Sequence, residues 1–316
     1  MLEQTIKNFC INFNAVNESR TFSSGQLVTG HFSFDLTKKT KITDISMRLK
    51  GHAHVHWSTG GGKNRSRRHF SGKITYFDLK GVILHGNSAI GGSMKLQPGT
   101  HMYPFTCQIP QGDFPSSFKD LHGRIEYVLT MSINRPWRVS KDFVTELNFI
   151  NHINTNQPEL HAPLKGSNQM TVCCLWCASP PITMTVSVEK KAFTPGETVK
   201  IICEFSNSSS RTATPRARLL QKQTLYTNER AHKRKYEKNL ASVVGQPIDA
   251  QTCDVHTEMM IVIPQSASFT IANCNVLVID YVIEVSLRVR CASDLTVLFP
   301  IILCDTPVHP QPPPYE

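Results

Sequence analysis

The sequence predicts an all-β protein built from two tandem β-sandwiches. Three observations carry this prediction. The most regular segments alternate apolar and polar residues, the chain repeats two of its own patterns in order, and its 316 residues correspond to about two domains of roughly 150 residues each. Hydrophobic residues make up 40% of the chain, which is enough apolar material for two cores.

The alternation is clearest in residues 125–133, 185–189 and 282–290, where every second residue is apolar. Successive side chains of a strand point to opposite faces of its sheet. These segments are therefore expected to be half-buried antiparallel strands. Turn residues such as Gly25 and Pro195-Gly196 separate them, and many short strands with regular turns are typical of sandwiches.

The internal repeat has two ordered matches. Phe22-Ser-Ser-Gly25-Gln-Leu-Val28 returns as Phe193-Thr-Pro-Gly196-Glu-Thr-Val199, at an offset of 171 positions. Ile109-Pro110 and Ile125-Glu-Tyr127-Val128 return as Ile263-Pro264 and Ile279-Asp-Tyr281-Val282, at an offset of 154. Constant offsets within each match indicate a duplicated domain. We place the two sandwiches at residues 1–152 and 181–305, a linker and domain entry at 153–180, and a proline-rich tail at 306–316.

Three stretches of the sequence resemble the arrestin domain-containing (α-arrestin) proteins. They are Phe22-Ser-Ser-Gly25-Gln-Leu-Val28-Thr-Gly30, Leu49-Lys-Gly51 with Val55-His-Trp57, and the segment 98–137 with Ile109-Pro110, Gly123-Arg-Ile-Glu-Tyr127 and Arg135-Pro136-Trp137. The resemblance covers roughly residues 5–304. It implies two arrestin-like, immunoglobulin-type sandwiches of seven or eight strands. It also implies a role in bringing ubiquitin ligases to membrane cargo for endocytosis and endosomal sorting.

One departure from the visual and β-arrestins concerns the segment before His101. Those proteins carry a short amphipathic helix there, whereas this chain has Pro98-Gly99 and no helical pattern ahead of it. This difference favours the α-arrestin branch and speaks against classical arrest of phosphorylated receptors.

The final residues contain a Pro-Pro-x-Tyr motif formed by Pro312, Pro313 and Tyr315. Proline fixes φ and favours a polyproline II helix, which docks into the aromatic grooves of WW domains at a small ordering cost. The tyrosine adds an apolar ring with a hydroxyl group. The alternative is a proline-rich end without a partner. With the α-arrestin resemblance, the implied partners are WW-domain HECT ubiquitin ligases of the Nedd4 type.

Two basic segments occupy equivalent places in the two repeats. The chain has a net charge of +10, which favours acidic partners. We expect the cytoplasmic tails of membrane cargo, such as receptors or transporters, or anionic lipids to contact them. The alternative is solvated hairpin tips; nucleic acid is not expected, because no aromatic platform accompanies the charges. The candidate residues are Lys63, Arg65, Arg67, Arg68, Arg230, Lys233, Arg234 and Lys235.

The sequence contains one histidine cluster and one cysteine cluster that are candidate metal sites. His52, His54 and His56 alternate in one expected strand, and no carboxylate or cysteine close in sequence completes a site, so a solvated strand face is expected. Cys173-Cys174-x-x-Cys177 lacks the second pair that a zinc site needs, so structural thiols are expected, with lipidation as an alternative. We expect no cofactor, no metal and no catalytic site, since no nucleophile elbow or phosphate-binding loop is present.

The compartment expected from the sequence is the cytoplasm, with recruitment to the plasma membrane and endosomes. The first residues lack a signal-peptide pattern, and the longest apolar stretch, near residues 295–303, is too short to span a membrane. The function we expect is a trafficking adaptor between cargo and a ubiquitin ligase. The alternatives are a retromer-type endosomal sorting subunit that needs no ligase, and a hydrolase or metal enzyme on a β-sandwich scaffold.

Overall fold

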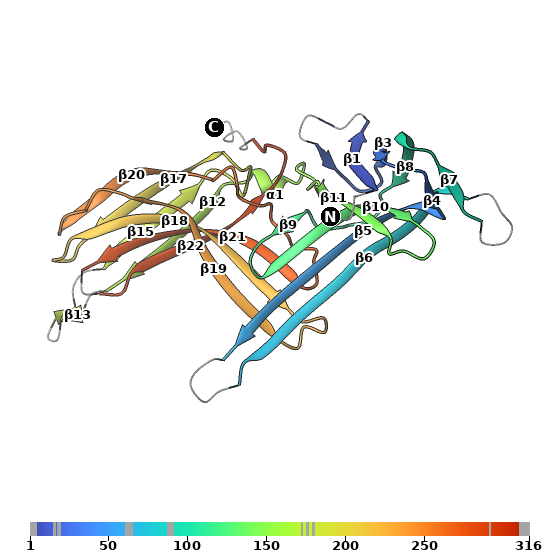
Figure 1. Ribbon diagram of the computed structural model, residues 1–316. Helices are drawn as coiled ribbons and strands as arrows, with labels where there is room; N and C mark the ends of the chain where they lie inside the picture. Colours follow the sequence, from blue (N-terminus) through green and yellow to red (C-terminus); the bar gives the residue numbers. More distant parts are fainter. Residues whose placement is uncertain are drawn as a thin grey trace. The chain divides into compact units, whose positions relative to one another are not determined.

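The computed structural model (Figure 1) describes residues 5–309 except 15–16, 18–19, 61–65, 87–91, 172, 175–176, 179–180 and 291. Strands dominate, and the one helix in this part of the chain is α1 (Pro158–His161). The prediction of an all-β fold is therefore confirmed. Within the described residues, no helix has the length and apolar character needed to cross a membrane.

The chain forms two compact units. Unit 1 comprises Met1–Asn151 with Leu225–His232 and Asn273–Val276, and unit 2 comprises His152–Thr224, Lys233–Ala272 and Leu277–Glu316. Two short segments of the second repeat thus belong to unit 1. The domain limits proposed from the sequence stay predictions.

Unit 1 is a sandwich of two principal sheets. One has the order β1-β3-β8, and the other has the order β2-β11-β10-β5-β6, with β9 beside β10 and a separate pair β4-β7. Only β2 and β11 among these pair in parallel. The strands are β1 (Ile6–Phe13), β2 (Thr21–Phe22), β3 (Leu27–Leu36), β4 (Thr40–Ile42), β5 (Asp44–Thr59), β6 (Arg68–His85), β7 (Met94–Leu96), β8 (Gly99–Gln108), β9 (Phe118–Lys119), β10 (Gly123–Asn134) and β11 (Lys141–Phe149).

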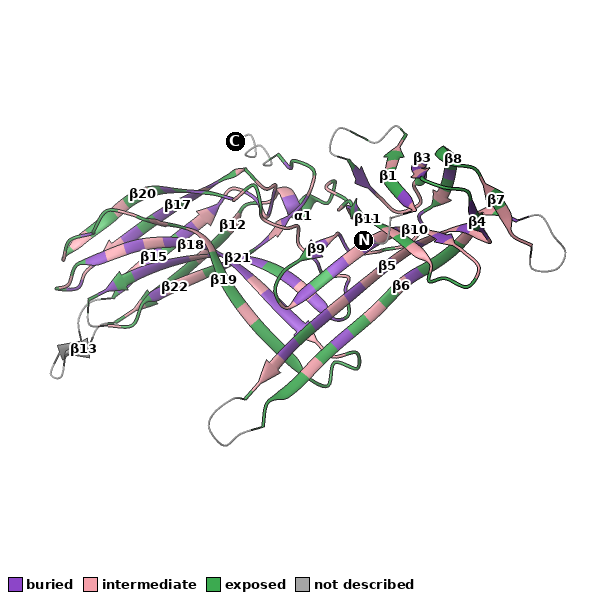
Figure 2. Cartoon of the chain, in the orientation of Figure 1, coloured by how far each residue is buried: buried purple, intermediate pink, exposed green. Residues whose placement is uncertain are grey.

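The core of unit 1 follows from the alternation in the sequence. In β10 every second residue from Ile125 to Ile133 is buried, as predicted, and its neighbours are only partly covered. In β3, Phe32 and Phe34 are fully buried. Figure 2 shows buried and partly buried residues alternating along β5. Apolar side chains on facing sheets bury one another in this way because burial removes them from water.

Unit 2 repeats this architecture. Its sheets have the orders β12-β15-β17-β20 and β16-β22-β21-β18-β19, and a small hairpin pairs β13 with β14. The strands are β12 (Leu164–Met170), β13 (Cys173–Cys174), β14 (Cys177–Ala178), β15 (Ile182–Val188), β16 (Ala192–Phe193), β17 (Thr198–Asn207), β18 (Ala213–Tyr226), β19 (Lys233–Val244), β20 (Thr252–Val262), β21 (Leu277–Val289) and β22 (Leu295–Leu303).

The duplication is visible in the strand orders and in matching turn contacts. β1-β3-β8 corresponds to β15-β17-β20, and β2-β11-β10-β5-β6 corresponds to β16-β22-β21-β18-β19. Gly25 and Gly196 have φ of +75° and +89°, a region that L-residues resist. Their N–H groups donate to the carbonyls of Pro110 (3.3 Å) and Ile263 (3.0 Å), the residues of the two Ile-Pro motifs.

The segment before His101 contains strand β7 and then β8, so its described residues, 92–100, hold no helix.

Candidate functional site

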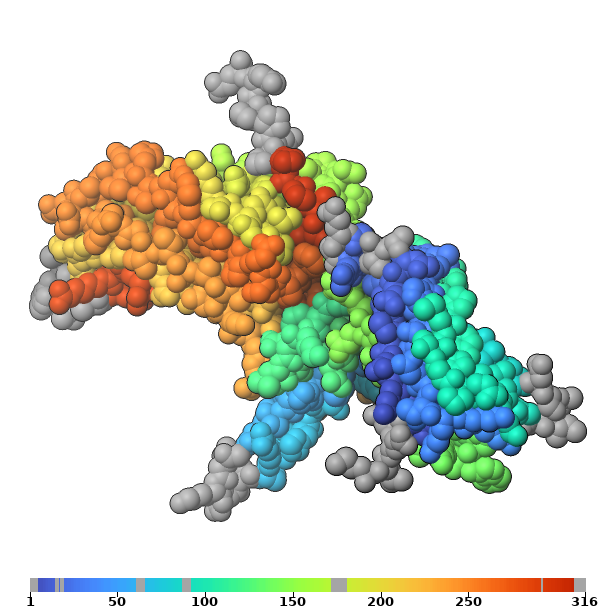
Figure 3. Space-filling view, turned by 45° about the horizontal axis from the view of Figure 1, so that its top comes forward, coloured from blue at the N-terminus to red at the C-terminus, as the bar shows by residue number. Residues whose placement is uncertain are grey.

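The Pro-Pro-x-Tyr motif at Pro312, Pro313 and Tyr315 lies outside the described residues, but the chain leading to it is held on unit 2. Val308 is 1% exposed and packs in an apolar cluster with Leu160, Ala192 and Cys304. Figure 3 shows the red end of the described chain at the molecular surface.

Two side chains bind the carbonyls at this end of the chain. The buried Lys190 ammonium donates to the Val308 carbonyl and to the Glu197 carboxylate. The His161 ring nitrogen Nδ1 donates to the His309 carbonyl at 2.7 Å. A buried charge is tolerated only when it is paired and hydrogen-bonded, as Lys190 is. The chain is therefore fixed up to His309, three positions before Pro312.

The basic candidates divide between the two units. Lys63 and Arg65 lie outside the described residues. Arg67 and Arg68 are exposed where β6 begins, and Arg230 also belongs to unit 1. Lys233, Arg234 and Lys235 are exposed at the start of β19 in unit 2. The two loops that carry these residues connect equivalent strand pairs, β5 with β6 and β18 with β19.

Several of these cations already have local contacts. The Arg67 Nε donates to Ser58 Oγ at 2.9 Å, and the Arg230 Nε donates to the Asn275 carbonyl at 3.2 Å. The Arg230 guanidinium also stacks 4.7 Å from the centre of the Tyr226 ring. None of the basic candidates in the described part of the chain forms an ion pair with a carboxylate. Their charge is therefore available to acidic partners.

The three histidines of β5 differ in environment. His56 is exposed, which fits a solvated strand face, whereas His52 is 15% exposed in its side chain and lies 3.4 Å from the Glu126 carboxylate. Burial lowers the pKa of His52, and Glu126 acts in the opposite direction. Burial, followed by the charge of Arg124, lowers the pKa of His54. Among the described residues, no three His, Cys, Asp or Glu side chains are arranged to hold a metal.

The Cys173, Cys174 and Cys177 segment forms the β13-β14 hairpin, in which Cys174 pairs with Cys177 along the backbone. The six other cysteines in the described part of the chain, Cys10, Cys107, Cys203, Cys253, Cys274 and Cys304, are free thiols.

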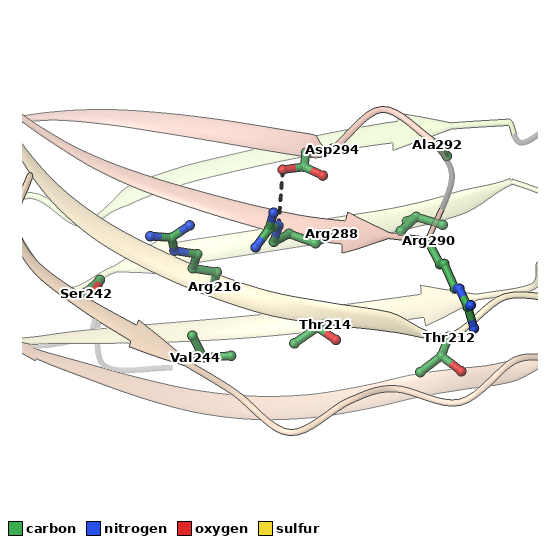
Figure 4. Close-up of a pocket in the computed structure, with 10 residues that line it drawn as sticks. Thr212, Thr214, Arg216, Ser242, Val244, Arg288, Arg290, Ala292 and Asp294 are labelled. Carbon is green, nitrogen blue, oxygen red and sulfur yellow. Dashed lines mark ion pairs between the residues drawn. The ribbon is translucent and has the colours of Figure 1, made fainter.

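A pocket of about 650 Å³ in unit 2 was not recognised from the sequence (Figure 4). Its cationic lining consists of Arg216 on β18 with Arg288 and Arg290 at the end of β21. Thr212, Thr214 and Ser242 add hydroxyl groups, and Asp294 is the single carboxylate of the lining. Arg288 lies 3.7 Å from Asp294.

The chemistry of this pocket suits an anion. Arg216 and Arg290 form no ion pair within the described residues, which leaves two guanidinium groups available. Arginine binds carboxylate and phosphate groups through two parallel hydrogen bonds, and hydroxyl groups can add further donors. The lining has no histidine or cysteine to serve as base or nucleophile. The sequence signal in this region was the alternation of residues 282–290, which predicts a half-buried antiparallel strand and does not by itself indicate an anion site.

Comparisons with known proteins agree with this architecture. The N-terminal domain model of arrestin (or S-antigen) matches residues 9–156, and the arrestin C-terminal domain model matches residues 178–308. The chain is 26% identical to Arrestin domain-containing protein 4 of Mus musculus over 294 residues, which cover 90% of this chain and 69% of that protein. It is 22% identical to Thioredoxin-interacting protein of Homo sapiens over 300 residues, which cover 94% of this chain and 74% of that protein.

Proposed function

This chain belongs to the arrestin-domain family, and from that premise we propose that it is a non-enzymatic adaptor in membrane-protein trafficking. Its sandwiches bind the cytoplasmic tails of cargo, and its Pro-Pro-x-Tyr motif recruits a WW-domain HECT ubiquitin ligase of the Nedd4 type. Ubiquitin is then transferred to the cargo, or to lysines of the adaptor, by the ligase. The adaptor works in the cytoplasm and at the plasma membrane and endosomes.

The observation that carries this proposal is the motif's position directly after an arrestin body. Pro312 follows the anchored His309 by three positions, so a ligase bound to the motif would be held next to unit 2. Ubiquitination of a bound cargo requires ligase and cargo on one scaffold. The adaptor supplies proximity, which replaces a bimolecular encounter by an effectively intramolecular one.

The test is binding of the full chain to the isolated WW domains of a Nedd4-type ligase, measured by calorimetry. We expect a dissociation constant near 1 μM, which corresponds to roughly −8 kcal/mol. Tyr315→Ala should abolish this binding, because it removes the ring that fills the WW groove. Gln311→Ala is the matched control in the same segment and should bind as the parent does. Equal binding by the Tyr315→Ala variant would exclude the motif as the docking site.

A cellular readout separates this function from the retromer-type alternative. The adaptor predicts that cargo ubiquitination falls with the Tyr315→Ala variant while the folded body stays intact. A sorting subunit would keep its partners and its effect on cargo after that change.

A further inference from the structure

The loop between β10 and β11 exposes a tryptophan completely. Trp137 is 103% exposed, and Val139 beside it is 88% exposed. Trp137 has φ of +57°, a left-handed conformation that is unusual for a bulky residue. The turn is closed by a hydrogen bond from the Arg138 N–H to the Arg135 carbonyl at 3.4 Å. Trp137 and Val139 together form a small apolar tip in water, and the residues around this tip show which kind of partner it fits.

Cations surround this tryptophan on two segments of unit 1. Lys38, Lys39 and Lys41 lie between β3 and β5, and Arg135 and Arg138 lie in the β10–β11 loop. All five line one hollow of about 250 Å³ together with Trp137, and its lining has no carboxylate. The two segments are joined by the bond from the Thr43 N–H to the Asn134 carbonyl at 2.8 Å.

These charges are not neutralised within the described part of the chain. None of the five cations forms an ion pair there. The Arg135 Nε is buried and has no hydrogen-bond partner among the described residues. A buried guanidinium N–H without a partner is costly and is normally satisfied by an anion or water. The neighbouring carboxylates are engaged elsewhere, since Asp44 accepts from Asn134 and Asp142 accepts from Ser140.

We propose that this surface, the Trp137 edge (Lys38, Lys39, Lys41, Arg135, Trp137, Arg138 and Val139), docks unit 1 onto an anionic membrane. The amphipathic indole ring enters the headgroup layer together with Val139, as tryptophans do at membrane interfaces. The five cations contact the phosphate and carboxylate groups of the lipids. This inference does not depend on the adaptor proposal, because it concerns other residues and another partner.

The composition of the edge favours a lipid surface over a protein. A stable protein interface buries about 800 Å² on each partner and has a packed apolar centre. The Trp137 edge instead has two apolar side chains surrounded by cations, three of which are lysines on flexible stems. Such side chains adapt to mobile headgroups, whereas a protein partner would have to order them at an entropic cost.

The experiment uses the full chain and two kinds of vesicle, phosphatidylcholine alone and phosphatidylcholine with phosphatidylserine. Affinity is measured by co-sedimentation, and insertion by quenching of tryptophan fluorescence with brominated lipids. We expect binding to the phosphatidylserine vesicles that weakens with salt. The difference in quenching between the parent and Trp137→Phe isolates the signal of Trp137.

Two variants and two matched controls test the residues. Trp137→Ala and the triple variant Lys38→Gln, Lys39→Gln, Lys41→Gln should each lower vesicle affinity by about tenfold, and the triple variant should also lose most of the salt dependence. Leu121→Ala, at another exposed apolar residue of unit 1, and Lys73→Gln with Lys80→Gln, at exposed lysines of β6, should bind like the parent. All changed residues are exposed, so thermal unfolding should stay unchanged.

Any of the following outcomes would overturn the proposal. One is parental affinity in both the Trp137→Ala and the triple variant. Another is equal quenching of the parent and Trp137→Phe by brominated lipid, or no binding to either vesicle. The third is binding of soluble glycerophosphoserine as tightly as vesicles, which would identify a site for free phosphate esters. A protein partner that binds through Trp137 while vesicles do not would likewise replace the membrane as the occupant.

Discussion

At the scale of single residues, the turn glycines show how a local constraint is repeated in both units. A Cβ built on Gly25 would lie 2.1 Å from Gln111 Oε1, and a Cβ on Gly196 would lie 2.1 Å from Gln265 Oε1. The glutamine ends can move aside, but the positive φ of each glycine remains unfavourable for alanine.

We therefore expect Gly25→Ala and Gly196→Ala each to lower the free energy of unfolding by about 1 kcal/mol or slightly more. Gly81→Ala is the control, because Gly81 lacks a positive φ and its built Cβ would meet only Met47 Cε, at 3.8 Å. That change should alter the free energy by less than about 0.5 kcal/mol. Urea unfolding measures the free energy of unfolding of all three variants. An equally large decrease for Gly81→Ala would refute the role of the positive φ.

The free thiols differ from one another in burial and in pKa. Burial raises the pKa of Cys203 to about 12 and that of Cys107 to about 11, because a thiolate loses its hydration there. The neutral thiol is thus favoured in the folded state. This contribution to stability is complete below the ordinary thiol pKa of 9.0 and is lost as the pH rises from 9.0 towards 12.

Alkylation with iodoacetamide at pH 8, followed by peptide mass spectrometry, tests this difference. Since the thiolate is the nucleophile, the exposed Cys10 and Cys253 should react at least about 100-fold faster than Cys203. In urea, where burial is lost, the rates should converge. Equal rates in the native protein would mean that Cys203 is accessible in solution.

At the scale of elements, the contacts that matter most for the proposed function attach residues 302–309, which lead to the Pro-Pro-x-Tyr motif, to unit 2. Ile302 and Cys304 continue the β16-β22 pairing by donating to the carbonyls of Lys191 and Phe193, each at 2.9 Å. The buried Lys190 ammonium then donates a hydrogen bond to the Val308 carbonyl. Its ammonium also lies 4.9 Å from the centre of the Phe193 ring.

Lys190→Ala should lower the free energy of unfolding by about 2–3 kcal/mol, below the upper range for a broken buried pair because Glu197 is 26% exposed. Hydrogen exchange of residues 304–309 should accelerate, since the segment loses its main polar contact. Lys191→Ala is the control, because it removes an ion pair with Glu159 (3.7 Å) in which Glu159 is 67% exposed. This change should lower the free energy of unfolding by at most about 0.5 kcal/mol. Unchanged exchange in Lys190→Ala would disprove the anchor.

At the scale of the whole molecule, the chain has a net charge of +10, and both units carry basic surfaces. The basic residues at the strand hairpins and the arginine pocket of unit 2 both face solvent without enough carboxylates to neutralise them. Apart from the Trp137 edge, which we assign to lipid, these two surfaces are the candidates for binding acidic cargo segments. The pocket has the more ordered geometry, because its arginines come from paired strands.

We therefore expect the double variant Arg288→Glu, Arg290→Glu to bind a synthetic Asp- and Glu-rich peptide about tenfold more weakly at low salt. Arg67→Glu with Arg68→Glu, which makes the same charge change on unit 1, should have a smaller effect. Fluorescence anisotropy over a range of salt concentrations measures both. The reverse order of effects would assign cargo binding to the hairpin at β6.

Local sequence patterns are enough to predict strands at the alternating segments, tight turns at the glycines, and the duplication. Alternation, positive-φ glycines and Ile-Pro strand ends are local properties, because each depends on a residue and its immediate neighbours. The Pro-Pro-x-Tyr motif is likewise readable from four residues, although its role stays a prediction.

Contacts between side chains that lie far apart in the sequence depend on the tertiary structure. It buried a lysine, Lys190, and exposed a tryptophan, Trp137, the reverse of what their residue types favour. It also assembled the pocket from Arg216 and Arg288, 72 positions apart, and assigned residues 225–232 and 273–276 to unit 1. The physical reason is that burial and charge clustering depend on contacts between strands distant in sequence, and no local pattern records those contacts.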